Sequence, residues 1–194
     1  RMNLDGSAQE VFARTDGRVL GFTFDAVGNL IAADAYLGLL SISPDKKITV
    51  LTDRVGIDPI RYADAVVVAR NGKMYFSDAS TRFGPKAWGG TFEASVLDIL
   101  EQAATGRVLE YDPTTKATRV VAKGIAFANG VALSDDEASI FVAETGKYRV
   151  WRIAVDAQNL DIGKPGTQAT VLLDNLPGYP DNLMRGLDGK IWMG

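Results

Sequence analysis

The apolar positions of the chain fall into short runs of about five residues, and polar turn residues separate the runs. Leu30–Asp34 and Met74–Asp78 are two such runs, and similar runs begin at residues 140 and 191. Gly, Asn and Asp in the preceding turns adopt the positive φ values that a two-residue hairpin turn requires. The turn dipeptides are Gly28-Asn29, Asn71-Gly72 and Asp188-Gly189. The pattern therefore predicts a succession of antiparallel β-hairpins.

These strands recur in groups of four. One group places strands within residues 64–77 and 106–122, and the next has them between residues 130 and 173. Four antiparallel strands repeating about every 40–45 residues are typical of a β-propeller blade. We therefore expect an all-β fold, a β-propeller present as an incomplete portion of about four blades. The expected divisions are the end of one blade (1–17), a blade (18–56), a blade with an insertion at 83–104 (57–124), a blade (125–176) and the start of another (177–194).

The two ends of the chain do not complete this pattern. Asp5-Gly6-Ser7 followed by Ala8–Ala13 is similar to the outer hairpin of a preceding blade, and residues 181–194 supply only a first hairpin. A propeller closes its ring to hide the edges of its sheets. We therefore expect these 194 residues to be part of a longer protein.

One segment, Phe92–Ala103, departs from the strand pattern. Its apolar residues recur at helical spacing between acidic ones, which predicts a short helix inside the insertion. Long insertions in compact repeats are often functional. Trp88 and Phe92 are therefore candidates for the lining of an apolar substrate pocket under a lid, although a loop that only covers a blade face is an equal alternative.

Composition and charge restrict the kinds of molecule that the chain is expected to bind. The chain is 46% hydrophobic and 23% charged, as globular domains are, and its net charge is −3. A slightly acidic chain without a Lys/Arg run argues against nucleic-acid binding. No window approaches the roughly 20 apolar residues of a membrane-spanning helix. A small molecule is the partner that we expect.

The absence of His and Cys narrows the possible chemistry. No imidazole base, thiol nucleophile or thiolate metal site can be formed by these residues. What remains is chemistry by carboxylates, amides, hydroxyls, Lys or Tyr, or by a metal held through oxygen atoms. Hard cations such as Ca²⁺ prefer such oxygen ligands.

The first strand of each blade is expected to line the central channel. Counting two residues back from the first apolar residue of these strands selects Leu20, Ala63, Asn129 and Asp181, and Asn182 follows directly. The Asn and Asp oxygens suit a hard cation. The same dipeptides also occur as ordinary turn caps that bind their own backbone.

Several motifs, taken in order along nearly the whole chain, carry a family resemblance. The clearest are Phe127–Ser134, Arg149–Ile153 and Leu176–Leu183, together with Gly21–Asp25 and Tyr75–Ser80. They resemble the strictosidine-synthase-like family, which is similar to the wider gluconolactonase (SMP-30), paraoxonase and regucalcin group. The resemblance implies a six-bladed propeller with a metal or substrate site at the mouth of the central channel.

The resemblance also implies roles for single residues. Positions matching Asn129, Asp181 and Asn182 hold a catalytic calcium ion in lactonase-like relatives, and Asp181 would then act as base or nucleophile. The implied function is divalent-metal-dependent hydrolysis of a lactone or ester. Ala63 departs from this pattern because it cannot coordinate a metal, and strand alternation is expected to turn Asp64 the other way.

Two other functions remain open. The plant synthases of the family condense an amine with an aldehyde, but they lack metal-type residues at the positions of Asn129 and Asp181. A non-catalytic propeller that binds a small molecule is the second alternative, because a fold does not dictate a function.

Acidic residues also recur at the ends of the second strands, as Asp34, Asp78 and Glu144. Recurrence at one place in every blade favours an architectural role over a catalytic one. We expect these acids to cap neighbouring loops, and Glu144 to pair with Arg149 or Lys147.

Overall fold

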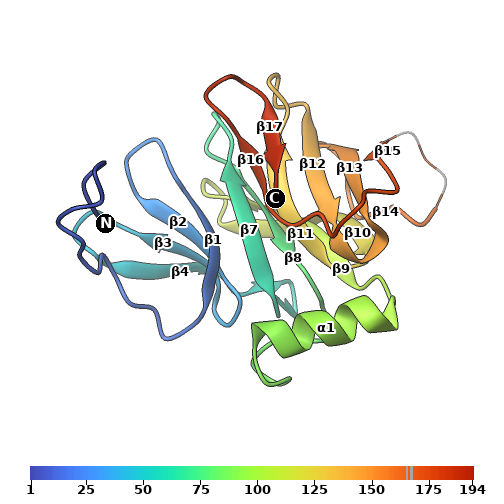
Figure 1. The fold of residues 1–194 in the computed structure, drawn as a ribbon, viewed down its shortest axis with the longest axis horizontal. Coiled ribbons are helices and arrows are strands. Elements are labelled where there is room, and N and C mark those ends of the chain that lie inside the picture. The colour runs from blue at the N-terminus through green and yellow to red at the C-terminus, as the bar shows by residue number, and fades with distance from the viewer. Residues whose placement is uncertain (165, 167) are drawn as a thin grey trace.

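The computed structural model describes residues 1–164, 166 and 168–194, and consists of antiparallel sheets that follow one another along the chain (Figure 1). The first sheet contains β1 (Val19–Phe24), β2 (Leu30–Asp34), β3 (Gly38–Ile42) and β4 (Ile48–Thr52). The second contains β7 (Ala63–Val68), β8 (Met74–Asp78), β9 (Gly106–Asp112) and β10 (Ala117–Ile125), with β14 (Leu160–Asp161) added parallel to β10. The third contains β11 (Ala128–Leu133), β12 (Ser139–Glu144), β13 (Arg149–Ala154) and β15 (Ala169–Leu173).

Three smaller elements complete the architecture. They are the hairpin of β5 (Arg54–Val55) and β6 (Asp58–Pro59), the hairpin of β16 (Leu183–Arg185) and β17 (Ile191–Met193), and the 3₁₀ turn η1 (Thr145–Lys147). In each large sheet the four main strands pair in chain order, as expected for propeller blades, and β14 is the additional strand at the edge of the second sheet. The all-β propeller prediction is confirmed, and within the described residues the sheets do not close into a ring.

The hairpin turns explain the order of the strands. Gly72 has a φ of 84° and its N–H donates to the Ala69 carbonyl at 2.9 Å, which reverses the chain between β7 and β8. Gly28 and Gly189 also have positive φ values, as the turn dipeptides predict. Local residue chemistry thus determines where each hairpin forms.

The N-terminal prediction is only partly correct. No strand is formed by Ala8–Ala13, whereas backbone hydrogen bonds join Arg1 to Glu10 and Asn3 to Ser7 around a turn. The described residues of this segment therefore form an irregular hairpin that is not part of a sheet.

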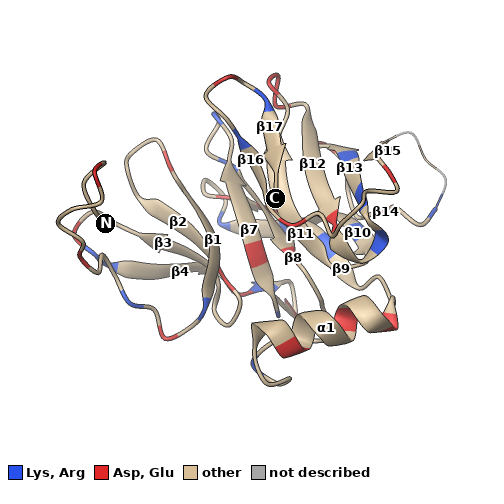
Figure 2. Cartoon of the chain, viewed as in Figure 1, with Lys and Arg blue, Asp and Glu red and all other residues tan. Residues whose placement is uncertain are grey.

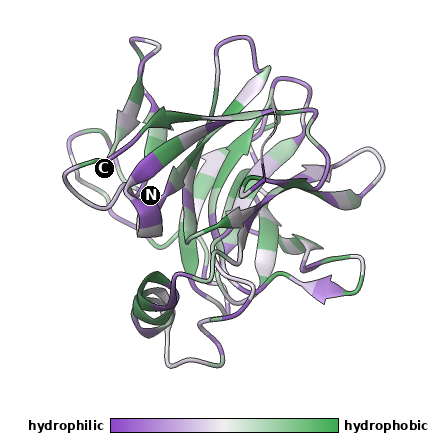
Figure 3. Ribbon diagram, turned by 90° about the vertical axis from the view of Figure 1, so that its right-hand side faces the viewer, coloured by the Kyte–Doolittle hydropathy of each residue, from purple (hydrophilic) through white to green (hydrophobic). Residues whose placement is uncertain are grey.

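Two apolar clusters fill the spaces between neighbouring sheets. The cluster between the first and second sheets includes Ile31, Leu39, Phe76 and Leu109. The cluster between the second and third includes Val108, Val121, Ile140 and Ile153. Burial of such side chains contributes about 25 cal/mol per Å². Figure 3 shows these hydrophobic strands inside a more hydrophilic outline of loops.

The inner strands β1, β7, β11 and β16 lie side by side in that order. A Cβ at Gly21 would lie 2.9 Å from the Ala65 Cα, and one at Gly130 would lie 2.3 Å from the Leu183 nitrogen. Glycine is therefore required where β1 approaches β7 and where β11 approaches β16.

The helix α1 (Thr91–Glu101) confirms the prediction of a short helix, and it ends two residues earlier than expected. Gln102 adopts a left-handed conformation with φ of 61°, which terminates the helix. Ala94 and Asp98 are its buried residues, and α1 lies near the ends of β7, β8 and β9 (Figure 1). In the described part of the chain, no helix is long and apolar enough to cross a membrane.

Candidate functional site

A bulge recurs at the start of the first strand in each of the three large sheets. The register between first and second strands shifts directly after Val19, Ala63 and Ala128. A bulge re-aims the side chains that follow it, which is why bulges are frequent beside functional sites. The residues that occupy this place are Leu20, Asp64 and Asn129.

The fourth hairpin has the same irregularity. The Asp181 N–H donates to the Gly194 carbonyl at 3.1 Å, and the Gly194 N–H donates to the Asn182 carbonyl at 3.0 Å. Asp181 and Asn182 therefore lie opposite the single residue Gly194, as in a bulge. The regular register resumes at Leu183, which pairs with Met193. Asp181 thus takes the place that Asn129 takes in the preceding sheet.

This register corrects one sequence expectation. Ala63 is fully buried in the core between the first two sheets, and Asp64 is the residue equivalent to Asn129. The expectation that Asp64 turns away from the site was wrong because alternation was counted without the bulge. Taking Val66 rather than Ala65 as the first apolar residue would have found Asp64.

The acidic members of this set are electrostatically linked. Asp64 is buried, and its burial together with the negative charge of Asp181 raises the Asp64 pKa to about 7. It is the acidic residue of β7, which is drawn red in Figure 2. A buried carboxylate whose pKa is raised by burial and by a nearby negative charge lies in a place that favours added positive charge.

Asn129 lies on β11, between β7 and β16, and is 5% exposed. Its Oδ1 atom is buried and has no hydrogen-bond partner among the described residues. Leaving a buried polar atom unsatisfied costs roughly 1–3 kcal/mol. A ligand that accepts electron density from this oxygen would remove that cost.

The donor set fits a hard divalent cation. Asp64 and Asp181 supply carboxylate oxygens and Asn129 an amide oxygen, and these are the ligand types that Ca²⁺ takes in proteins. Asn182 is exposed and takes the register place of Gly130, and its role as a ligand stays a prediction. Within the described residues, no group of three or more Asp, Glu, His or Cys side chains is placed to hold a metal, so a metal site here would need the Asn129 amide as well as the carboxylates.

Tyr62 connects the site to the insertion, and the sequence analysis did not identify it. Its hydroxyl donates to the Thr91 carbonyl at 2.7 Å, and its ring meets Phe127 edge-on at 5.4 Å. Burial, followed by the charges of Asp64, Asp98 and other groups, raises the Tyr62 pKa, so its hydroxyl stays a hydrogen-bond donor. The start of α1 is thereby held beside the residues that precede β7 and β11.

Asp98 attaches the middle of α1 to the sheets. It is 1% exposed, the Thr105 hydroxyl donates to its Oδ2 at 3.4 Å, and its Oδ1 has no partner among the described residues. Burial raises the Asp98 pKa, and the hydrogen bonds from Ser80 and Thr105 oppose that shift only in part. The folded protein therefore holds the proton of Asp98 more strongly than the unfolded chain does.

Asp98→Asn is expected to flatten the pH dependence of stability. Because the folded-state pKa is raised, the wild-type protein loses stability as pH rises from the ordinary carboxyl value of 3.8 through the folded value. The variant lacks this loss, so its stability relative to the wild type should increase with pH. Urea unfolding at several pH values measures the trend, with the exposed helix variant Glu93→Gln as control. A relative stability independent of pH would contradict the expectation.

The predicted pocket residues differ in their surroundings. Trp88 lines a cavity of about 290 Å³ beside the insertion and packs edge-on against Phe83 at 5.1 Å. Phe92, in contrast, is 74% exposed and is not among the residues that line this cavity. The structure thus does not bring the two side chains into one pocket.

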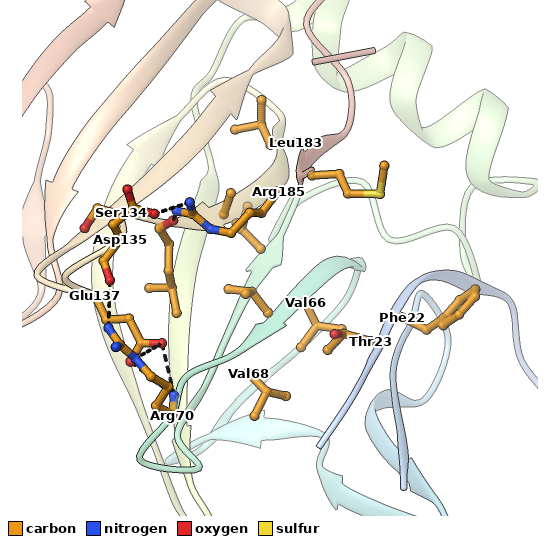
Figure 4. Close-up of a pocket in the computed structure, with 15 residues that line it drawn as sticks. Phe22, Thr23, Val66, Val68, Arg70, Ser134, Asp135, Glu137, Leu183 and Arg185 are labelled. Carbon is orange, nitrogen blue, oxygen red and sulfur yellow. Dashed lines mark hydrogen bonds and ion pairs between the residues drawn. The ribbon is translucent and has the colours of Figure 1, made fainter. Parts of the chain in front are cut away.

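A larger cavity of about 460 Å³ lies along the later residues of the inner strands (Figure 4). Its middle is formed by apolar residues such as Val66 and Val68, and ion pairs lie at its rim. The pairs are Arg70–Glu137 and Arg185–Asp135, and both arginines also bind backbone carbonyls. Each of these charged side chains thus has a partner, and the two ion pairs join neighbouring hairpins. Their role is therefore structural.

The recurrent acids at the ends of the second strands are structural, as expected. Asp34 accepts the backbone N–H of Arg18, Asp78 that of Tyr62, and Glu144 that of Ala126. Each carboxylate therefore binds the segment that leads into the first strand of its sheet. The Glu144 carboxylate also pairs with Arg149 at 2.5 Å and accepts the Trp151 indole N–H at 2.6 Å.

Comparison with solved structures agrees with this architecture. A gluconolactonase from Xanthomonas campestris matches with a TM-score of 0.69 and 19% identity, covering 90% of this chain and 55% of that one. A calcium-binding regucalcin from Agrobacterium tumefaciens matches with a TM-score of 0.63 and 16% identity, covering 92% and 53%. Repeated four-stranded sheets, adjacent inner strands and these likenesses define a β-propeller.

Sequence comparison gives the family. The family model for strictosidine synthase matches residues 64–158. Protein Strictosidine synthase-like 4 of Arabidopsis thaliana is 38% identical over 188 residues, which cover 96% of this chain and 46% of the relative. The chain belongs to the strictosidine synthase-like family, and it spans about half the length of the curated relatives it matches.

Proposed function

We propose that this propeller is a divalent-metal-dependent hydrolase of a lactone or ester, with Ca²⁺ as the ion. The observation that carries the proposal is the unsatisfied buried Oδ1 of Asn129 beside the linked carboxylates of Asp64 and Asp181. The gluconolactonase and the calcium-binding regucalcin among the structural neighbours support the same chemistry. Both likenesses are below 25% identity, so the site residues carry the argument.

The residues of the proposed site have different roles in metal binding and proton transfer. A bound divalent cation would supply Lewis acidity toward the carbonyl oxygen of the substrate. Asp64 and Asn129 are buried and fixed by their strands, so they would hold the ion together with Asp181. Asp181 is exposed, and its carboxylate accepts the proton of the attacking water. No His is present in the sequence to do so, and Asn182, which follows Asp181 directly, would add an oxygen ligand.

Asp181→Asn in the intact protein tests the proposal. The change keeps the shape but removes a negative charge and a proton acceptor, so bound metal and hydrolysis of a panel of lactones and aryl esters should fall together, the rate by roughly a hundredfold or more. Elemental analysis and rate measurements give the two readouts. The matched control is Asp188→Asn in the turn of the same hairpin, where the carboxylate binds the Lys190 N–H. Full activity in the Asp181 variant would refute the proposal.

A condensation of an amine with an aldehyde is the second candidate, and the match to the strictosidine synthase model over residues 64–158 favours it. That reaction requires no metal. Activity that survives exhaustive chelation would therefore support condensation over hydrolysis. Ligand binding without turnover in both assays would instead indicate a binding propeller.

A further inference from the structure

We propose that the cavity beside the insertion is a second binding site, which takes a small aromatic carboxylate. The cavity has a volume of about 290 Å³ and lies between the β2–β3 loop, the segment before β7 and the start of the insertion. Its charged and aromatic lining residues are Tyr36, Asp53, Arg61, Arg82, Lys86 and Trp88. The volume is near the lower end of the roughly 300–1,000 Å³ typical of ligand sites, so the ligand is small. The inference does not depend on the proposed hydrolase activity.

The lining carries an excess of positive charge. Asp53 is its acidic residue, and that carboxylate is already paired with Arg54 at 2.7 Å. Arg82 is paired with Glu101 of α1. The side chains of Arg61 and Lys86 form no ion pair or hydrogen bond with any described residue. Two cationic groups are therefore free to bind an anion.

The wall that carries Trp88 is ordered by its own hydrogen bonds. The Ala87 N–H donates to the Gly84 carbonyl at 3.0 Å, and the Trp88 N–H donates to the Pro85 carbonyl at 3.3 Å. A Cβ at Gly84 would lie only 3.2 Å from the Arg61 Cβ, so this loop packs directly on the residue that supplies one cation. The loop that carries Trp88 is thereby packed on the backbone and Cβ of Arg61, and both residues line the same cavity.

The aromatic lining of the cavity indicates that the uncharged part of the ligand is a planar ring. Trp88 is 45% exposed while its ring rests on Phe83, which is buried in the core below α1. Tyr36 lines the same cavity from the β2–β3 loop. A planar ring can pack against these side chains, and a carboxylate on that ring can accept paired N–H donors from a guanidinium. Arg61 is suited to this pairing because its planar fork matches a carboxylate.

Binding of phenylacetate to the intact protein tests the inference, with its neutral isostere phenylacetamide as the matched ligand. Isothermal titration should show phenylacetate binding at least tenfold more tightly than the amide, with quenching of the Trp88 fluorescence that is lost in Trp88→Phe. The Arg61→Gln/Lys86→Gln double variant should bind phenylacetate at least tenfold more weakly. Lys47→Gln, an exposed cation in the β3–β4 turn, should bind it as the wild type does.

Three results would overturn the inference. They are equal affinity for the acid and the amide, unchanged affinity in the double variant, and no binding of phenylacetate up to about 10 mM. Loss of lactone or ester hydrolysis in Asp181→Asn with phenylacetate binding intact would leave both sites supported. Failure of the hydrolase test alone leaves this inference standing, because none of its lining residues belongs to the metal set.

Discussion

Arg107→Met is expected to lower the free energy of unfolding by about 3–5 kcal/mol, because it leaves a buried carboxylate without its partner. The Arg107 Nε donates to Asp78 Oδ2 at 2.9 Å, and the two side chains are 8% and 0% exposed. The Arg107 Nη2 also donates to the Pro59 carbonyl at 2.9 Å. One guanidinium thus connects β8, β9 and the segment that leads into β7. Urea unfolding followed by circular dichroism measures the loss.

The matched control is Arg54→Met, which removes an ion pair with Asp53 whose side chains are 63% and 52% exposed. An exposed pair contributes about 0–1 kcal/mol, so this change should be small. Adding Asp78→Asn to Arg107→Met should restore part of the stability, because the uncompensated charge is then gone. A loss for Arg107→Met no larger than the loss for Arg54→Met would contradict the assigned role of the pair.

The strands were predictable because their signals are local. Short apolar runs and turn dipeptides such as Asn71-Gly72 act within a few residues, and β2 and β8 begin and end where the sequence indicates. The irregular residues 8–13 show the limit of this approach. Their similarity to the outer hairpin of a blade predicts a strand, but a strand also needs a neighbour with which to pair.

The candidate site was less predictable because it depends on pairing across strands. The bulge that makes Asp64 equivalent to Asn129 is defined by which residues of β8 and β12 lie opposite, and one sequence does not show that register. Tyr62 connects the site to the insertion through a hydrogen bond to Thr91, 29 residues away. The cavity at Trp88 likewise draws on three separate segments.

Gly130, the residue after Asn129, belongs to the bulge of β11 and also lies where β11 contacts β16. Its neighbours across the gap to β16 are backbone atoms, the Leu183 nitrogen and the Asp181 carbonyl, and its own N–H donates to that carbonyl at 2.9 Å. The distance between the Asn129 and Asp181 donors is therefore set by how closely β11 approaches β16. Glycine at this position allows the close approach of the strands, on which the proposed site also depends.

Gly130→Ala is expected to weaken metal binding at least tenfold and to destabilise the protein by about 1–3 kcal/mol. A Cβ would lie 2.3 Å from the Leu183 nitrogen and 2.5 Å from the Asp181 carbonyl oxygen, and since both are backbone atoms the strands must separate. Separation moves Asp181 away from Asn129, so affinity should fall although no proposed ligand is changed. Calcium titration and urea unfolding of the same variant measure both effects.

Gly178→Ala is the matched control, because a Cβ at Gly178 in the loop just before β16 would have no heavy atom within 4 Å. Its metal affinity and stability should equal those of the wild type. If Gly130→Ala were destabilised but bound calcium with unchanged affinity, the approach of β11 to β16 would matter for packing alone. The donors would then not lie across that contact, and the metal set of Asp64, Asn129 and Asp181 would be wrong.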